Sequence, residues 1–308
     1  MTRFLTLGEI MVEMAPAPDS PGLFRLGYAG DTFNTAWYAR RLLPASWTVS
    51  YGTVIGDDPM STDLAQFIER QGVATDTLRR IRDRTVGLYM IQTREGERSF
   101  SYWRGQSAAR TLADDPDWLD NIFANRAVIQ FSGITLAILT PEARKSLCAA
   151  LARARAAGSH IAFDTNLRPR LWDSAEAMRS GLLQGAAVSD TVLPSFDEEQ
   201  LAFQDATPEE TVQRYRAAGA SCVVIKNGEA PCHGWSQTDG TVTCTPPKVA
   251  RVVDSTAAGD SFGAGFLAAR ATGASLGTAM TRAAHLAAEV IQHPGALAPQ
   301  IFETGEPS

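Results

Sequence analysis

Residues 252–267, VVDSTAAGDSFGAGFL, pass from a β-like apolar stretch through a run of small residues into a helix. Ala257, Ala258 and Gly259 allow neighbouring backbone N–H groups to approach one another, and the positive end of the helix dipole attracts a phosphate or a developing oxyanion. Asp260 stands where this helix starts, beside the charge that such an anion hole would collect. The stretch therefore predicts an anion site with a carboxylate suited to act as a base on a hydroxyl group.

The spacing of these residues also fits a purely structural interpretation. Glycine-rich turns before helices are common, and in that interpretation Asp260 is only a helix cap while Gly263 and Gly265 permit close packing. The choice between the two interpretations depends on the rest of the chain.

The chain alternates short apolar runs, rich in β-branched residues, with helical stretches. Such alternation predicts βαβ units, a mostly parallel sheet and an α/β fold. Helix starts are indicated at Thr140 followed by Pro141, and at Ser195, where Glu198 is placed to close a capping box. The predicted strands lie in the segments FLTLGEI, WTVSYGTVIG, AVIQFSG, HIAFDTN, DTVLP and CVVIKNG.

One segment departs from this alternation. Residues 85–104, TVGLYMIQTREGERSFSYWR, alternate like a hairpin with Glu95 and Gly96 at the turn. Residues 11–28, which contain several prolines, are expected to add further strands to the same small sheet. We therefore predict an antiparallel flap beside the main sheet, and catalytic sites often lie at such junctions.

The composition excludes several classes of protein. The chain has 308 residues, 44% of them hydrophobic, and a net charge of -6 with scattered basic residues, which disfavours a nucleic-acid surface. No run approaches the ~20 apolar residues that span a bilayer, and we expect a cytoplasmic protein without a membrane partner. The four cysteines lack metal-ligand spacing and are expected to be reduced and structural, and no metal site is predicted from protein side chains alone.

The segment Asp254–Asp260, DSTAAGD, resembles the C-terminal signature of the ribokinase-like (PfkB) family of sugar kinases, usually Asp-Thr-x-Gly-Ala-Gly-Asp. The resemblance implies a three-layer α/β/α sandwich with a small β-sheet lid, as a single domain over residues 1–308. It implies ATP and Mg²⁺ as cofactors and leaves room for a monovalent cation such as K⁺. It also implies that Asp260 is the catalytic base, that Ala257, Ala258 and Gly259 form the anion hole, and that Asp254 contacts the substrate.

A second motif lies near the N-terminus. Residues 29–36, AGDTFNTA, open a helix after a glycine turn, and Asp31 and Asn34 share one helical face. The segment resembles the family's Gly-Gly-Asp/Asn-x-x-Asn-x-Ala substrate motif, which implies that Gly30, Asp31 and Asn34 bind the sugar hydroxyls. By itself Asp31 is equally well explained as a helix N-cap.

Within the flap, Tyr102 and Arg104 project from the same face of a strand. The segment SYWRGQSAAR resembles the corresponding part of a subgroup of the family, the bacterial 2-keto-3-deoxygluconate kinases. This implies that Tyr89, Tyr102 and Arg104 bind an acidic sugar, because a guanidinium can grip a carboxylate through two hydrogen bonds. Without the resemblance, these are equally well surface residues of an exposed strand.

Two further segments follow predicted strands. Residues 163–172, FDTNLRPRLW, resemble the same subgroup's Phe-Asp-x-Asn-x-Arg-Pro-x-Leu-Trp. This implies that Asn166 and Arg168 face the ATP phosphates and the transferred group, with Asp164 orienting either these two residues or a metal-bound water. The alternative is a salt-bridged loop. Lys226 and Gly228 resemble the family's turn near the nucleotide.

The four motifs occur in family order, and the chain lacks both the P-loop and the protein-kinase catalytic motif. The resemblance implies that the protein phosphorylates 2-keto-3-deoxy-D-gluconate at its primary hydroxyl with ATP. Two alternatives stay open: another sugar kinase of the family, such as a fructokinase or a ketogluconate kinase, and a non-catalytic sugar or nucleotide sensor. Exposed aromatic residues on the flap also predict a homo-oligomer formed through the lid.

Overall fold

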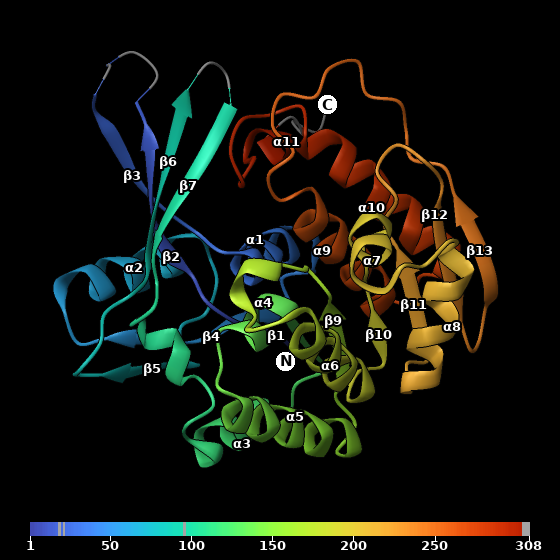
Figure 1. Ribbon diagram of the computed structural model, residues 1–308, viewed down its shortest axis with the longest axis horizontal. Helices are drawn as coiled ribbons and strands as arrows, with labels where there is room; N and C mark the ends of the chain where they lie inside the picture. Colours follow the sequence, from blue (N-terminus) through green and yellow to red (C-terminus); the bar gives the residue numbers. More distant parts are fainter. Residues whose placement is uncertain (18–19, 21, 95–96, 304–308) are drawn as a thin grey trace.

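The protein is described here by a computed structural model that covers residues 1–17, 20, 22–94 and 97–303. Within these residues the main sheet has nine strands, and the six strands predicted from apolar runs are neighbours in it (Figure 1). The strand order is β13 (Gly240–Cys244), β12 (Cys232–Ser236), β11 (Cys222–Ile225), β10 (Thr191–Val192), β9 (His160–Asp164), β8 (Val128–Ser132), β1 (Thr2–Leu7), β4 (Trp47–Gly56) and β5 (Leu78–Ile81).

The strands from β11 to β5 run parallel, and only the pairs β11–β12 and β12–β13 are antiparallel. The parallel strands β4, β8, β9 and β11 are largely buried on both faces, as their mostly apolar sequences require, whereas the edge strand β5 is partly exposed. The predicted mostly parallel sheet is therefore confirmed, whereas β5, β12 and β13 were not anticipated.

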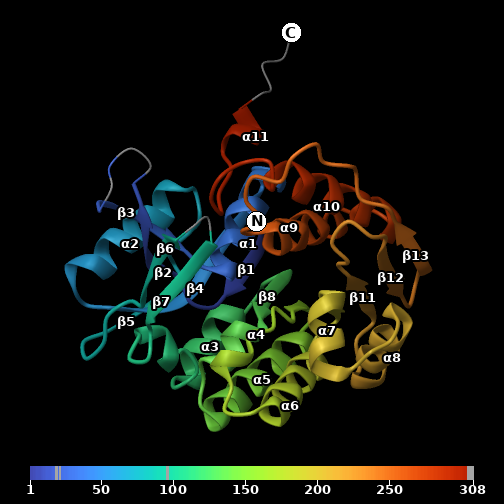
Figure 2. The same ribbon diagram turned by 45° about the horizontal axis from the view of Figure 1, so that its top comes forward.

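Helices cover both faces of this sheet and form two separate hydrophobic cores (Figures 1 and 2). On one face lie α1 (Asp31–Leu42), α2 (Pro59–Arg70), α9 (Ala258–Ala271), α10 (Leu276–Val290) and the short α11 (Gln300–Glu303). The other face carries α3 (Pro116–Phe123), α4 (Gly133–Ala137), α5 (Pro141–Ala156), α6 (Ala175–Ala187), α7 (Phe196–Phe203) and α8 (Pro208–Ala218). Short 3₁₀ turns span Ala108–Thr111 and Pro169–Leu171. The predicted three-layer sandwich is confirmed.

The local signals for helix starts had different outcomes. Thr140 caps α5 by accepting a hydrogen bond from the backbone N–H of Ala143, with Pro141 at the first position, as predicted. The capping box predicted at Ser195 is wrong, because the Ser195 side chain makes no capping bond and the carboxylate of Glu198 bonds elsewhere.

A second sheet stands beside the main one, and we call it the lid sheet (Figure 1, upper left). Its order is β3 (Phe24–Ala29), β2 (Met11–Pro16), β6 (Leu88–Arg94) and β7 (Glu97–Trp103). The pairs β2–β3 and β6–β7 are antiparallel and β2–β6 is parallel. The predicted hairpin and the extra strands from residues 11–28 are present, while the predicted turn residues Glu95 and Gly96 lie outside the described residues.

Close packing of α9 against α10 supports the position of the α9 N-terminus. A Cβ atom on Gly265 would lie 3.1 Å from the Cα atom of Ala283, so that this glycine has the packing role foreseen for it. All four cysteines are free, as expected. Among the described residues, no helix is long and apolar enough to cross a bilayer.

Candidate active site

Several site residues lie at the carboxyl edge of the main sheet, among them Glu9, which was not predicted. Asp164 ends β9, Lys226 directly follows β11, and Glu9 comes two positions after β1. Because parallel strands present their carboxyl ends at one edge, these loops lie together, and open α/β sheets bind their ligands at this edge.

The N-terminal turn of α1 reaches the N-terminal turn of α9. Gly30 is the N-cap of α1, and a Cβ atom there would come 2.3 Å from the carbonyl oxygen of Glu9, so that only glycine fits. Asp31 is the first helical residue, which makes its interpretation as the N-cap wrong. One turn along, the Nδ2 atom of Asn34 donates a hydrogen bond to Oδ2 of Asp260 at 2.8 Å. The two motifs therefore meet, although they lie at opposite ends of the chain.

The start of α9 is built by a residue in an unusual conformation. Ala257 is the N-cap with φ 61° and ψ 14°, in the left-handed region that favours glycine. Asp260 is the third helical residue, and the alternative in which it caps the helix is wrong. The N–H of Ala258 bonds to the carbonyl of Ser255 at 3.2 Å, while those of Gly259 and Asp260 belong to the first helical turn, where no helical carbonyl precedes them. This turn is the part of α9 that can accept an anion.

The surroundings of Asp260 raise its pKa to about 8. Loss of solvation is the main cause, and the negative charge of Asp31 adds to it, whereas the hydrogen bond from Asn34 and the charge of Lys226 favour the ionised form. The residue keeps part of its surface open to solvent. A carboxylate with a pKa close to the working pH is well suited to accept a proton from a hydroxyl group.

A chain of hydrogen bonds joins two of the strand-end loops to the start of α1. Lys226 Nζ lies 2.9 and 3.0 Å from the two carboxylate oxygens of Asp164. Asp164 also accepts a bond from the backbone N–H of Asn166 at 3.2 Å, and the Nδ2 atom of Asn166 donates to Oδ2 of Asp31 at 2.8 Å. Asn166 has a φ of 30°, which this double anchoring holds in place. Asn166 thus reaches the predicted sugar-binding residue Asp31.

Lys226 also lies close to the start of α9, because a Cβ atom on Gly259 would be 3.3 Å from Nζ. Two residues further on, Gly228 has a φ of 57° in an open turn. The predicted turn after β11 therefore begins beside the predicted anion hole.

The loop after β9 is held by a residue that was not predicted to be part of the site. Glu198 accepts a bond from the N–H of Leu167 at 3.0 Å and pairs with the Nη1 atom of Arg168 at 2.9 Å. The salt bridge of the structural alternative is thus present, while half of the Arg168 side chain stays exposed and can reach a ligand.

The lid sheet gathers its three predicted residues on one face. Tyr89 and Tyr102 are direct partners in the β6–β7 register with ring centroids 5.8 Å apart, and the guanidinium carbon of Arg104 lies 6.0 Å from the Tyr102 ring centroid. The hydroxyl group of Tyr89 donates a hydrogen bond to the carboxylate of Glu13 on β2. Burial and the negative charge of Glu13 together raise the pKa of Tyr89. Arg104 forms an ion pair with Glu9.

Asp254 is buried and braces the loop before α9. Its carboxylate accepts bonds from the N–H and the hydroxyl of Thr256, at 3.1 and 2.7 Å, and from the N–H of Gly295 at 2.9 Å. These contacts join the loop to the segment after α10. Its contact with the substrate stays a prediction.

Glu9 and Glu13 were not predicted as site residues, although the sequence holds a signal for both. They are the two acids within the apolar N-terminal stretch MTRFLTLGEIMVEM, where a charge needs a specific partner. Each is bonded to one of the predicted lid residues. An acidic residue in an otherwise apolar strand segment therefore indicates a specific partner elsewhere in the fold.

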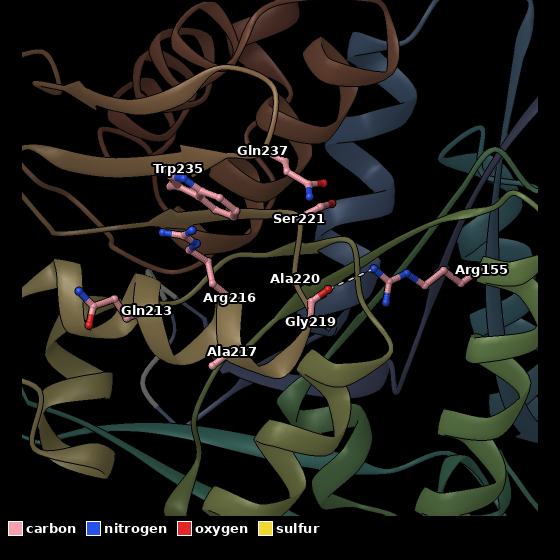
Figure 3. Close-up of a pocket in the computed structure, with 9 residues that line it drawn as sticks. All are labelled: Arg155, Gln213, Arg216, Ala217, Gly219, Ala220, Ser221, Trp235 and Gln237. Atoms are coloured by element: carbon pink, nitrogen blue, oxygen red, sulfur yellow. Dashed lines mark hydrogen bonds between the residues drawn. The ribbon is translucent and has the colours of Figure 1, made fainter.

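Two surface cavities lie at the opposite, amino edge of the sheet. The larger, of about 620 Å³, surrounds the end of α8 and the start of β11 (Figure 3). There Arg155 is bonded to Asp190 and to the carbonyl of Gly219, and Arg216 stacks on the ring of Trp235. The second, of about 440 Å³, is lined by Trp47, Ala127, Val128, His160, Leu267, Arg270, Ala271, Gly273 and Ala274. Neither cavity contains a predicted site residue.

Comparison with known proteins gives a consistent result. Residues 1–301 match the family described as pfkB family carbohydrate kinase. The 2-dehydro-3-deoxygluconokinases of Dickeya dadantii and of Escherichia coli K12 are each 36% identical to this chain, covering 95% and 97% of it and 96% and 97% of their own lengths. A crystal structure from Escherichia coli, assigned as a ribokinase II in complex with ATP and Mg²⁺, has a TM-score of 0.83 at 22% identity and covers 99% of this chain and 98% of its own.

Proposed function

The chain belongs to the pfkB family of carbohydrate kinases, and from this membership we propose that it transfers the terminal phosphoryl group of ATP to 2-keto-3-deoxy-D-gluconate. The acceptor is the primary hydroxyl of the sugar acid, and the product is the 6-phosphate. 2-Dehydro-3-deoxygluconate, after which the two relatives at 36% identity are named, is the same compound. The observation that carries the proposal is the 2.8 Å bond between Asn34 and Asp260, which joins the predicted sugar-binding and catalytic helices.

Asp260 acts as the base in this reaction. The hydroxyl oxygen of the sugar attacks the terminal phosphorus, the bond to the bridging oxygen of ADP breaks, and the hydroxyl proton passes to the Asp260 carboxylate. The pKa of about 8 supports this role, because a more acidic group would hold the proton too weakly. The amides of Gly259 and Asp260 belong to the first turn of α9 and would stabilise the charge of the transferred group.

Cationic groups around α9 would offset the charge of the triphosphate. Lys226 lies next to Gly259, and Arg168 is half exposed in the adjoining loop, so that both can approach phosphate oxygens. We assign Asn166, Gly228 and Ala258 to the nucleotide side of the site on the family motifs alone.

The residues present fit a magnesium ion that arrives with the nucleotide. Among the described residues, no group of three or more His, Cys, Asp or Glu side chains could hold a metal ion by itself. This suits Mg²⁺, which keeps several waters and binds proteins through one or two carboxylates and substrate phosphates. Asp164 and Glu198 both interact with the charge of Lys226, and Glu198 is the more exposed of the two. When bound with the nucleotide, the ion would supply positive charge that offsets the charge of the phosphates.

The lid provides the selectivity for an acid. Arg104 with Tyr89 and Tyr102 forms a face that carries a guanidinium and hydroxyl groups and that fits a carboxylate flanked by polar groups. Asp31 and Asn34 are then left for the hydroxyl groups at the other end of the sugar.

Steady-state rates on a panel of sugars test the function. We expect kcat/KM for 2-keto-3-deoxygluconate to exceed that for fructose by at least tenfold, because the fructose molecule has no carboxylate for Arg104. Equal values for the two sugars would favour a fructokinase. Absence of turnover with every sugar, together with measurable binding, would favour a sensor.

A second copy of the chain is the proposed partner of the lid sheet. Aromatic residues on both of its faces are exposed, with 54% of Tyr102 accessible on one face and 59% of Trp103 on the other, and Leu26 and Phe100 lie in the same sheet. An apolar sheet surface of this kind is typically covered by another protein surface. Light scattering should therefore show an oligomer, and a strict monomer at micromolar concentration would contradict this assignment.

A further inference from the structure

An ion pair fastens the lid sheet to the main sheet. Glu9 lies in the loop after β1, and Arg104 directly follows β7. The carboxylate of Glu9 pairs with the Nη2 atom of Arg104, with only 1% of the Glu9 side chain and 11% of the Arg104 side chain exposed. The cation assigned to the sugar carboxylate is therefore already held by a buried anion.

This pair is not built for maximum stability. Within the part of the chain that the structure describes, Oε1 of Glu9 and Nε of Arg104 are buried without a hydrogen-bond partner. A buried ion pair that leaves polar atoms unsatisfied contributes little net stability, because desolvation offsets the attraction. Unsatisfied buried groups in a native protein instead point to a functional constraint.

The position of Glu9 is closely confined by backbone. A Cβ atom on Gly87 would lie 2.9 Å from Oε1 of Glu9 and 3.3 Å from Cβ of Arg104. On its other side, the carbonyl oxygen of Glu9 lies against Gly30, the N-cap of α1. Glu9 thus contacts both the lid arginine and the start of the helix that carries Asn34.

We propose that Glu9 is a positioning residue that sets the selectivity for an acidic sugar by orienting Arg104. The inference rests on the proposed function. A free arginine side chain loses rotamer entropy when it is immobilised. Because Glu9 already holds one edge of the guanidinium, this entropy is lost before the sugar binds, and the orientation of the guanidinium is fixed in advance.

The charge of Glu9 has a second effect. It offsets the positive charge of Arg104, so that a small inorganic anion gains little by binding there. An acidic sugar gains affinity from its hydroxyl contacts to α1 as well as from the guanidinium. Glu9 thereby favours the complete sugar acid over isolated anions.

A double-mutant cycle on Glu9 and Arg104 tests the proposal. Glu9→Gln keeps the shape of the side chain and removes its charge. We expect the KM for 2-keto-3-deoxygluconate to rise about tenfold, as loss of ~1.4 kcal/mol of oriented binding requires. The kcat, the KM for ATP and the inefficient turnover of fructose should stay within twofold. In an Arg104→Gln background, Glu9→Gln should change the KM less than twofold.

Glu13→Gln is the matched control, because Glu13 is a half-buried acid on β2 of the lid sheet and contacts Tyr89 instead of Arg104. Its effect on KM should add to that of Arg104→Gln. Additive effects of Glu9→Gln and Arg104→Gln would overturn the proposal, as would an equal loss of activity on the acidic and the neutral sugar. If Arg104→Gln alone leaves the KM for the acid unchanged, the role of Arg104 in the proposed function fails and Glu9 loses its role with it.

Discussion

Replacement of Asn34 by leucine should move the pH dependence of the kinase. Asn34 donates to the Asp260 carboxylate at 2.8 Å and favours its ionised form, and leucine cannot donate. A hydrogen bond to a charged group contributes about 1.5–3 kcal/mol, and ~1.4 kcal/mol corresponds to one pKa unit. The pKa of Asp260, about 8 in the wild type, should therefore rise by roughly one to two units.

The assay is the rate of ADP formation between pH 6 and 10, measured as kcat/KM for the sugar acid. The rising limb of the profile should move from about pH 8 toward 9–10. Loss of the Asn34 contact to the sugar lowers kcat/KM equally at every pH, whereas the shifted limb adds a further loss of roughly ten- to a hundredfold at pH 7 that shrinks in alkali. Thr35→Val is the control, because the Thr35 hydroxyl bonds to the backbone carbonyl of Asp260, at 3.4 Å, and leaves the carboxylate untouched. A limb that stays at the wild-type pH in Asn34→Leu would refute the assignment of Asp260 as the titrating base.

Three further predictions concern stability. Because the pKa of Asp260 is higher in the folded than in the unfolded protein, the folded protein binds more protons between about pH 4 and 8, and its stability falls as the pH rises through that window. The Asp260→Asn variant should therefore melt at a higher temperature than the wild type above pH 8 and at the same temperature at pH 4. A lower melting temperature of the variant at pH 8.5 would contradict the raised pKa. Ala257→Gly should stabilise the protein by about 1 kcal/mol in urea titrations, since it relieves a left-handed alanine at a small entropic cost, and a destabilised variant would argue against this backbone conformation. Lys226→Met should lower the free energy of unfolding by about 3–5 kcal/mol at neutral pH, because it leaves Asp164 buried without its cation. An unchanged free energy of unfolding would show that the ion pair is not formed.

The main sheet was predictable because its strands are short apolar runs separated by helical segments, a pattern that the local sequence carries. The edge hairpin β12–β13 was not, since Cys232–Ser236 and Gly240–Cys244 alternate weakly and contain glycines. The false capping box at Ser195 shows the limit of local signals: Glu198 forms tertiary bonds to the loop after β9, and these replace the local bond.

The site was predictable where its residues form short contiguous motifs in the sequence. Asp260 with its small-residue turn, and Asn34 after its glycine turn, were found in this way, but their direct bond spans 226 positions and could be seen only in three dimensions. The role of Glu9 could not be predicted from the sequence, because it depends on contact with Arg104, 95 positions away. A buried charge is evident from the sequence as an anomaly, whereas its partner is decided by the topology of the sheets.

The reaction of the Asp260→Asn variant with ATP and 2-keto-3-deoxygluconate tests the central claim most directly. Titration calorimetry should show the sugar acid bound within a few-fold of the wild-type affinity, while turnover in the coupled assay falls by at least a hundredfold, because the variant keeps the site and loses the proton acceptor. A variant that binds the sugar and phosphorylates it at the wild-type rate would contradict the assignment of Asp260 as the base.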